Sequence, residues 1–279
     1  MITSISNQQM KYIVQLQKKA KFRFEQGVFV VEGIKMCLEA PKEWVVDMYV
    51  SDSFLGREEH KAYLAGYHYE IVAENIFLKI SDTKTPQGIL CIVKMPKYQI
   101  KDLLQGEKTH LLLLERIQDP GNLGTMIRTG EGAGITGVIM NNTTVDLFHP
   151  KTIRSTMGSI YRTPFLVTDD LTQTAKELKH AGVSLYATHL LGEVAYDCQN
   201  YRRPTGFLIG NEGNGLSHET AKLADSSIHI PMEGQVESLN AAVAAALLMY
   251  EVHRQRGSGD HFCSTPTHGA ALKNLCSDI

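Results

Sequence analysis

The chain has 279 residues, enough for two domains of ordinary size, and 43% of them are hydrophobic, as in globular proteins with buried cores. This composition excludes disorder over most of the length, and no apolar run approaches the roughly 20 residues that a membrane-spanning helix needs. A formal net charge of −2 argues against a protein that coats nucleic acid indiscriminately. The polar start at residues 2–9 also lacks the pattern of a secretion signal, so we expect a cytoplasmic protein. The 5 cysteines lie far apart without a C-x-x-C pair, so we expect reduced thiols and no bound metal.

The chain begins with a basic segment, because no Asp or Glu occurs between Met1 and Phe24. A helix is predicted over residues 7–20, where apolar residues recur at helical spacing. The positive charges of this segment form what we call the basic arm: Lys11, Lys18, Lys19, Lys21 and Arg23. Such charges either contact the phosphates of a nucleic acid or form a solvated helix face, and we keep both interpretations.

The remainder of the first hundred residues alternates short apolar and polar segments, which indicates a small α/β domain over residues 1–100. Its predicted elements are strands at 28–31, 45–50 and 88–93 and a helix at 33–38. Polar and turn-forming residues then predominate, and we predict a linker over residues 101–107.

From residue 108 onward, apolar strands alternate with helices, which is typical of a parallel sheet covered by helices on both faces. The predicted strands are 111–114, 137–140, 184–188, 206–209 and 227–230. The predicted helices are 123–133, 150–157, 171–180, 216–223 and 238–253. We place this second α/β domain at 108–256 and predict a flexible tail over 257–279, where Ser, Gly, Thr, His and Pro predominate.

Polar, glycine-rich motifs follow three of these strands, where open parallel sheets bind ligands. They read D-P-G-N-L-G-T-M-I-R (119–128), G-N-E-G-N-G (210–215) and I-P-M-E-G-Q-V-E-S-L-N (230–240). The first lacks the Lys and Ser/Thr of a P-loop, and the second does not have the dinucleotide spacing. Each motif alone could serve only a turn or a helix cap, but together they indicate one site at one end of the sheet.

The order of these motifs resembles the SpoU (TrmH) family of the SPOUT class of RNA methyltransferases, and residues 154–158 also match a family segment. The resemblance is strong over residues 111–251 and weaker over the N-terminal domain, which is similar to the family's ribosomal-protein-like domain for RNA substrates. It implies a parallel sheet with a C-terminal trefoil knot, an exception to the rule that protein chains are unknotted. It also implies S-adenosyl-L-methionine as cofactor and a homodimer formed through the knot region.

The resemblance assigns roles to individual residues. Those implied to bind the cofactor are Thr188, Gly210, Ile230, Met232 and Leu239. Those implied to form the catalytic, RNA-facing side are Asn122, Arg128, Glu212, Ser238 and Asn240. Candidate RNA contacts outside the pocket are Lys11, Lys18, Lys19, Arg23 and Arg154. Glycine at 210 would let the backbone approach the cofactor closely, because no Cβ intervenes.

Methyl transfer to a ribose hydroxyl is an in-line displacement, so positioning is most of the work. A guanidinium stays protonated in proteins, and we therefore expect Arg128 to hold a phosphate and favour negative charge on the 2′-oxygen, unless it only pairs with Glu131. The final helix is apolar from 241 to 249 and needs burial on more than one side, which either a second copy of the chain or the tail and sheet of the same chain would supply. The sequence predicts an S-adenosylmethionine-dependent 2′-O-methyltransferase of RNA, with ribosomal RNA as the expected substrate. A non-catalytic RNA-binding protein of the same fold and an RNA base methyltransferase remain alternatives.

Overall fold

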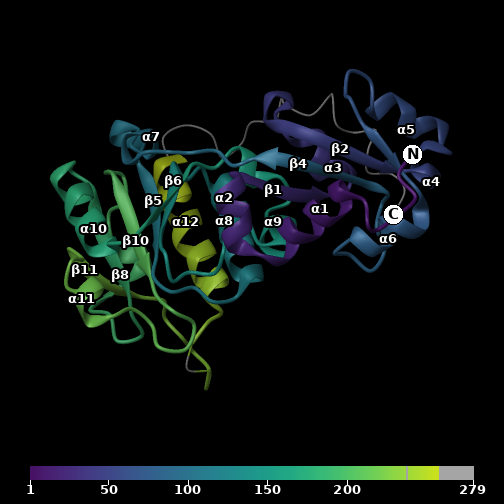
Figure 1. Cartoon of the computed structure of the whole chain (residues 1–279). Helices are drawn as coiled ribbons and strands as arrows, with labels where there is room; N and C mark the ends of the chain where they lie inside the picture. Colours follow the sequence, from purple (N-terminus) through teal and green to yellow (C-terminus); the bar gives the residue numbers. More distant parts are fainter. Residues whose placement is uncertain (237, 258–279) are drawn as a thin grey trace.

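The computed structural model describes residues 1–236 and 238–257 and contains two sheets, one of four and one of seven strands. Figure 1 shows the four-stranded sheet with its helices in one half of the molecule and the seven-stranded sheet in the other. The predicted α/β class, with a smaller N-terminal unit before a parallel sheet, is confirmed. Except for Gly257, the predicted tail lies outside the described residues.

The N-terminal sheet has the strand order β1-β4-β2-β3. Its strands are β1 (Val28–Glu32), β2 (Val45–Ser51), β3 (Glu70–Val72) and β4 (Ile89–Lys94). Its helices are α1 (Gln8–Lys18), α2 (Ala20–Gln26), α3 (Ile34–Glu39), α4 (Asp52–Leu55), α5 (Glu58–Tyr63) and α6 (Glu74–Ile80), with the short turn η1 (Lys42–Trp44). The sequence prediction missed β3 and α4 to α6, because segments of three to seven residues carry too little periodicity to be recognised.

The basic arm is bent, and this corrects one predicted contact. The predicted helix over 7–20 ends at Lys18, and the extended residue Lys19 (φ −120°) starts α2 in a new direction. Arg23 is therefore buried, with 2% of its surface exposed, and its guanidinium donates to the carbonyl oxygens of Leu16 and Gln17 at the end of α1 and pairs with Asp146. The prediction that Arg23 contacts RNA is wrong, because a buried cation needs these internal partners.

The seven-stranded sheet is parallel throughout, with the order β7-β6-β5-β10-β8-β11-β9. Its strands are β5 (His110–Leu114), β6 (Gly137–Asn141), β7 (Phe165–Thr168), β8 (Ser184–Thr188), β9 (Val194–Ala195), β10 (Thr205–Ile209) and β11 (Ser226–His229). The central strands β5 and β10 are buried at every position, which explains their continuous apolar runs. The two edge strands β7 and β9 were not predicted, since both are short and only partly buried.

Helices cover this sheet and pack beside one another. They are α7 (Ile100–Leu103), α8 (Pro120–Ala133), α9 (Pro150–Thr156), α10 (Leu171–His180), α11 (His218–Ala221) and α12 (Ala241–Gly257), with the turns η2 (Gly106–Lys108), η3 (Ser159–Tyr161) and η4 (Tyr196–Cys198). The predicted linker is ordered, because Leu103 is fully buried and a Cβ on Gly137 would lie 2.4 Å from its Cγ. No helix within residues 1–236 and 238–257 is long and apolar enough to cross a membrane.

The two halves share a continuous core. The ring of Phe29 in β1 lies 4.8 Å from that of Phe148, which precedes α9, and the Tyr161 hydroxyl donates to the Met36 carbonyl at 2.8 Å. The ion pair between Arg154 in α9 and Asp82 also joins the halves. The N-terminal half is therefore held in a fixed place beside the seven-stranded sheet.

Candidate active site

A pocket of about 370 Å³ opens at the carboxyl ends of β8, β10 and β11, which are neighbours in the sheet. We call it the cofactor pocket. Its walls include every residue that the resemblance assigns to the cofactor: Thr188, Gly210, Ile230, Met232 and Leu239. The volume falls in the range of small-molecule sites, roughly 300–1,000 Å³. The structure thus brings together residues that lie up to 51 positions apart in the chain (188 to 239).

Gly210 begins a tight loop that closes on itself. Asn211 and Gly215 exchange main-chain hydrogen bonds of 3.1 and 2.8 Å, and Asn211 Oδ1 accepts from the N–H groups of Gly213 and Asn214. A Cβ on Gly210 would lie 2.1 Å from the carbonyl carbon of Gly215. The backbone of the loop itself therefore requires glycine at 210, so the close approach of a ligand is not needed to explain it.

A chain of side-chain hydrogen bonds joins the three glycine-rich motifs. Asn240 Oδ1 caps α12 by accepting from the N–H groups of Ala242 and Val243, at 2.9 and 3.3 Å. The amide nitrogen of Asn240 is thereby turned to Asn122 and donates to its Oδ1 at 3.0 Å. Asn122 Nδ2 donates in turn to Glu212 Oε1, also at 3.0 Å. One predicted catalytic residue from each motif therefore meets the others at this end of the sheet.

Glu212 also fixes the start of the first motif. Its carboxylate accepts from the main-chain N–H groups of Gln118 and Asp119, at 3.1 and 3.3 Å. Partial burial acts to raise the pKa of Glu212, but the hydrogen bonds from Asn122 and from main-chain N–H groups prevail and hold this pKa below its usual value. Glu212 is therefore ionised at neutral pH and serves as an acceptor that organises two loops, which makes it a weak base.

Among the described residues, no hydrogen bond joins the two remaining predicted catalytic residues, Ser238 and Arg128, to these three side chains. Ser238 lines the cofactor pocket. Arg128 lies on an exposed part of α8, and its guanidinium has no hydrogen bond or ion pair with any residue that the structure describes. The alternative partner Glu131 pairs with Arg162 instead. Arg128 is thus available to an external anion.

Helices α8 and α12 lie side by side, and the first turn of α12 lines the pocket. Asn122 meets Asn240 at their first turns, and a Cβ on Gly132 would lie 3.2 Å from the Tyr250 hydroxyl near their ends. One face of α12 stays uncovered, because Val243, Leu247 and Tyr250 keep 49%, 37% and 49% of their surfaces exposed. We call these three residues the apolar stripe.

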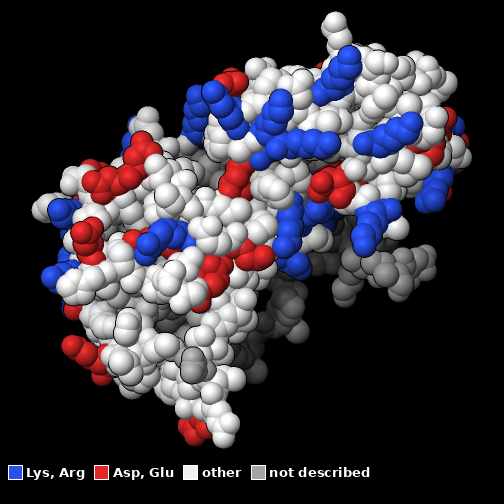
Figure 2. Space-filling view, turned by 60° about the horizontal axis from the view of Figure 1, so that its bottom comes forward, with Lys and Arg blue, Asp and Glu red and all other residues white. Residues whose placement is uncertain are grey.

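The lysines of the basic arm remain candidates for RNA contact. Lys11, Lys18, Lys19 and Lys21 are exposed on α1, α2 and the bend between them. Figure 2 shows Lys and Arg side chains gathered over the N-terminal half on one face of the molecule, whereas Asp and Glu are more frequent over the other half. The predicted contact at Arg154 is not tested by its ion pair with Asp82 and stays a prediction.

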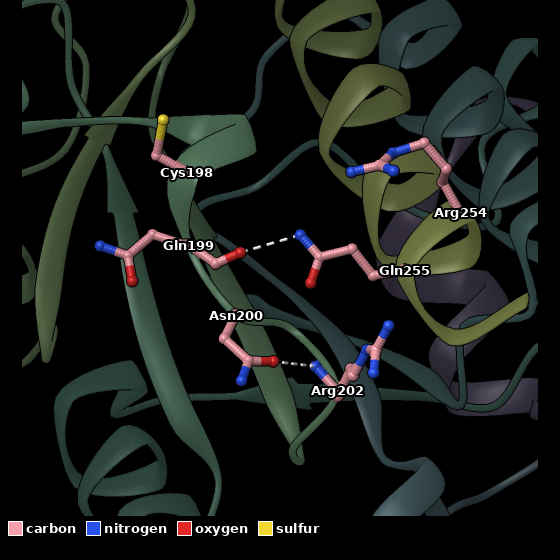
Figure 3. A pocket seen from close by; sticks show the side chains of 6 residues that line it. All are labelled: Cys198, Gln199, Asn200, Arg202, Arg254 and Gln255. Atoms are coloured by element: carbon pink, nitrogen blue, oxygen red, sulfur yellow. Dashed lines mark hydrogen bonds between the residues drawn. The ribbon is translucent and has the colours of Figure 1, made fainter. Parts of the chain in front are cut away.

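A second hollow, of about 290 Å³, lies at the other end of α12 (Figure 3). Its walls are Cys198, Gln199, Asn200, Arg202, Arg254 and Gln255. Gln255 Nε2 donates to the Gln199 carbonyl at 2.8 Å, so part of its polar lining is satisfied internally. The cofactor pocket uses Ala241 and Ala244 from the first turn of α12, so the two hollows are separate, and none of the motifs contributes to the second.

Comparison with known protein families identifies both halves of the molecule. Residues 109–250 match the model of the SpoU rRNA methylase family, and residues 7–91 match that of the MRM3-like substrate binding domain. The chain belongs to the SpoU rRNA methylase family. The first match contains all three motifs, and the second covers most of the four-stranded sheet. The family predicted from the motifs is confirmed.

Similar proteins cover nearly the whole chain. The 23S rRNA (guanosine(2553)-2′-O)-methyltransferase RlmP of Bacillus subtilis is 34% identical, over 90% of this chain and 98% of the relative. The SpoU methyltransferase AviRb of Streptomyces viridochromogenes, solved in complex with the cofactor AdoMet, superposes with a TM-score of 0.82 at 27% identity, over 91% of this chain and 100% of that one. An AdoMet-bound rRNA methyltransferase of Sinorhizobium meliloti gives a TM-score of 0.79 at 32% identity, over 91% of this chain and 97% of that one.

The cofactor pocket fits S-adenosyl-L-methionine, the cofactor of the family. Apolar side chains such as Ile228, Leu239 and Leu248 can cover a purine face, and the 210–215 loop offers main-chain groups. His229 also lines the pocket, and its Nδ1 is a buried atom without a hydrogen-bond partner in the part of the chain that the structure describes. An unpaired buried nitrogen is costly unless a ligand engages it. Sequence reasoning missed His229, although its place at the end of β11, directly before Ile230, was an available signal.

Proposed function

We propose that this protein transfers the methyl group of S-adenosyl-L-methionine to a ribose 2′-hydroxyl of ribosomal RNA, and that it does so in the cytoplasm. The observation that carries the proposal is the hydrogen-bonded chain Asn240–Asn122–Glu212, which unites the three family motifs beside the cofactor pocket. The MRM3-like substrate-binding domain over residues 7–91 supports RNA as the substrate.

The geometry suits a reaction that depends on alignment. When bound, S-adenosyl-L-methionine supplies a methyl group on a positively charged sulfur. The amides of Asn122 and Asn240 hold each other, and Ser238 lies in the pocket wall beside them, so the acceptor ribose meets polar groups whose orientation is already fixed. Arg128, whose guanidinium has no partner among the described residues, would contact the RNA and stabilise negative charge that develops on the 2′-oxygen. Because Glu212 is ionised and hydrogen-bonded by three donors, we assign it to positioning.

The partner of the proposed enzyme, besides RNA, is a second copy of itself. The apolar stripe supports this proposal, because exposed Val243, Leu247 and Tyr250 on one helix face would gain from burial. We expect Leu247→Glu to shift the protein from dimer to monomer in light scattering. The trefoil knot remains a prediction from the family; the central place of β10 between β5 and β8 is compatible with it.

One experiment separates the proposed function from its alternatives. The protein is incubated with ribosomal RNA from cells that lack it and with S-adenosyl-L-methionine carrying a labelled methyl group, and the RNA is digested to nucleosides for mass spectrometry. Label on ribose supports the proposal. Label on a base would favour the base methyltransferase, and RNA binding without transfer would favour the non-catalytic alternative.

The role proposed for Arg128 predicts that replacing it lowers the rate of methyl transfer. Arg128→Ala should lower methyl transfer by at least about a hundredfold, equivalent to roughly 2.7 kcal/mol of transition-state stabilisation, because the guanidinium is assigned to RNA and developing charge. Affinity for S-adenosyl-L-methionine, measured by calorimetry, should stay within a few-fold. Arg128→Lys should restore little of the lost rate, since the compact ammonium of lysine does not reproduce the planar arrangement of N–H donors in a guanidinium. The control is Lys176→Ala, at an exposed position on α10, which should leave the rate of methyl transfer unchanged. A normal rate in Arg128→Ala would show that Arg128 is not part of the site.

A further inference from the structure

Arg116, the second residue after β5, has a main-chain conformation that residues with a side chain rarely adopt. Its φ is +56°, and within residues 1–236 and 238–257 only Arg116 and Met157 combine a side chain with a positive φ. This conformation is strained and persists only where surrounding contacts hold it. Met157 is the C-cap of α9, a common place for it. Arg116 lies before α8 and caps no helix, so its positive φ needs another reason.

The side chain of Arg116 does not supply that reason. Its Nε is a buried atom with no hydrogen-bond partner in the part of the chain that the structure describes. Its Nη2 lies 3.9 Å from Glu115 Oε2, too far for a hydrogen bond. That carboxylate is already engaged, because it accepts from Ser217 and Thr220. The guanidinium gains little from the strained conformation, so the reason lies in the main chain.

The main-chain groups of Arg116 join three separate segments. Its N–H donates to Asn141 Oδ1, at the end of β6, over 2.9 Å. Its carbonyl oxygen accepts from Nδ2 of Asn211 at 2.9 Å and from Nε2 of Gln118 at 3.1 Å. The φ and ψ of a residue set the relative directions of its N–H and C=O groups. The positive φ therefore lets Arg116 contact β6 and the second glycine-rich motif at the same time.

Asn211 transmits this contact to the cofactor pocket. Its Oδ1 accepts from the N–H groups of Gly213 and Asn214, at 2.9 and 3.0 Å, and so shapes the loop that lines the pocket. Its Nδ2 is the other end of the same planar amide and is fixed by the Arg116 carbonyl. The orientation of the Asn211 amide, and with it the loop, therefore depends on the direction of that carbonyl.

Glu115, the neighbouring residue, holds the other end of the same segment. Its carboxylate is buried and accepts from the N–H and the hydroxyl of Ser217, at 2.7 and 2.8 Å. Its own N–H donates to the Ile209 carbonyl at 2.9 Å, directly before the loop begins at Gly210. Two consecutive residues after β5 thus fix the segment 209–217 at both ends.

We propose that Arg116 is a positioning residue of the cofactor site and acts through its main chain: its carbonyl, directed by the positive φ, anchors the Asn211 amide and thereby the 210–215 loop. The proposal rests on the proposed function, because methyl transfer would take place in the pocket that this loop lines. It implies that conformation and not charge decides which residues are tolerated at 116. Glycine and asparagine adopt positive φ readily, whereas a β-branched residue does not.

The first test compares three variants that all lack the guanidinium. Arg116→Gly and Arg116→Asn should bind S-adenosyl-L-methionine within a few-fold of the wild type in calorimetry, because both residues accept the positive φ. Arg116→Val should bind at least about tenfold more weakly, since valine disfavours this conformation. The matched control is Met157→Val, which makes the same change at a positive φ outside the pocket and should leave the affinity unchanged.

The second test removes the hydrogen bond from its other side. Asn211→Asp keeps an acceptor for the N–H groups of the loop but places an oxygen against the Arg116 carbonyl, so binding should weaken by about tenfold. In the double variant Arg116→Val/Asn211→Asp, the loss should be no larger than in the weaker-binding single variant, because both changes break one contact.

Three outcomes would overturn the proposal: equal affinities in Arg116→Gly and Arg116→Val, additive losses in the double variant, or wild-type affinity in Asn211→Asp. The last outcome decides the matter if Arg116→Val does not fold. Methyl transfer to ribosomal RNA by the wild type is measured in parallel. If the wild type transfers no methyl group while the affinities follow the expected pattern, the proposed function falls and the positioning role of Arg116 stands.

Discussion

The motif loops and the basic arm are both rich in polar residues, but their side chains end in different places. At the carboxyl ends of β5, β10 and β11, Asn122, Glu212 and Asn240 converge on one another. In the basic arm, the lysines stay in solvent, while Arg23 turns into the interior and pairs with Asp146. Parallel strands bring their ends to one edge, whereas the inner and outer faces of a helix depend on what covers it. Polar residues at strand ends therefore predict a meeting point, and a run of charges on a helix does not.

The largest effect should come from removing the buried cation. Arg23→Ala leaves the partly buried Asp146 without its partner and the carbonyls of Leu16 and Gln17 without a donor, so we expect a loss of about 3–5 kcal/mol of unfolding free energy in urea denaturation. Lys18→Ala, on the exposed side of the same arm, should change it by less than about 0.5 kcal/mol. Equal losses in the two variants would erase the distinction between the inner and outer charges of the arm.

The next effect tests the motif loops. Gly210→Val would drive a side chain into the backbone of Gly215 and Leu216, so the loop must open and the cofactor pocket must change shape. We expect affinity for S-adenosyl-L-methionine in calorimetry to fall at least about a hundredfold, or roughly 2.7 kcal/mol, together with some loss of stability. Gly234→Ala is the matched control, because Gly234 does not line the cofactor pocket and its Cβ would meet no described atom within 4 Å. Intact binding in Gly210→Val would show that the loop is not part of the pocket.

Much of the fold and of the site could be predicted from the sequence, for a physical reason. Strands such as β5 and β10 are buried on both faces and read as continuous apolar runs, and the motifs lie directly after such strands. Helix α12 was also predicted, but it starts at Ala241 and not at the predicted residue 238, because the Asn240 side chain caps its first turn. The predicted cofactor residues share one pocket for the same reason: they follow neighbouring strands.

Other features could not be predicted, because they depend on contacts between distant segments. The partner of Arg23 is 123 residues away, and nothing local to the basic arm indicates it. The need for glycine at 210 arises from a turn whose closure involves Gly215, and the unpaired nitrogen of His229 has meaning only inside the assembled pocket. Local pattern predicted which segments form the site, whereas the steric and electrostatic reasons for single residues required the fold.

The smallest effect concerns the lysines that remain outside. Lys11, Lys18 and Lys19 are exposed, and we expect them to contact RNA phosphates. Replacing all three by Gln should reduce the slope of log affinity against log salt concentration by about 2, since each lost contact with single-stranded RNA contributes roughly 0.7. The change is measured from RNA binding at several salt concentrations, and affinity for S-adenosyl-L-methionine should not change.

A control with the same change in charge decides whether position matters. Lys101, Lys108 and Lys176 are equally exposed but lie on α7, η2 and α10, away from the basic arm. Replacing these by Gln should leave the salt slope unchanged, because a lysine that touches no phosphate releases no counterion when RNA binds. If both triple variants lower the slope alike, the basic arm acts only through overall charge. If neither does, its lysines are a solvated helix face and the RNA is held by the catalytic half.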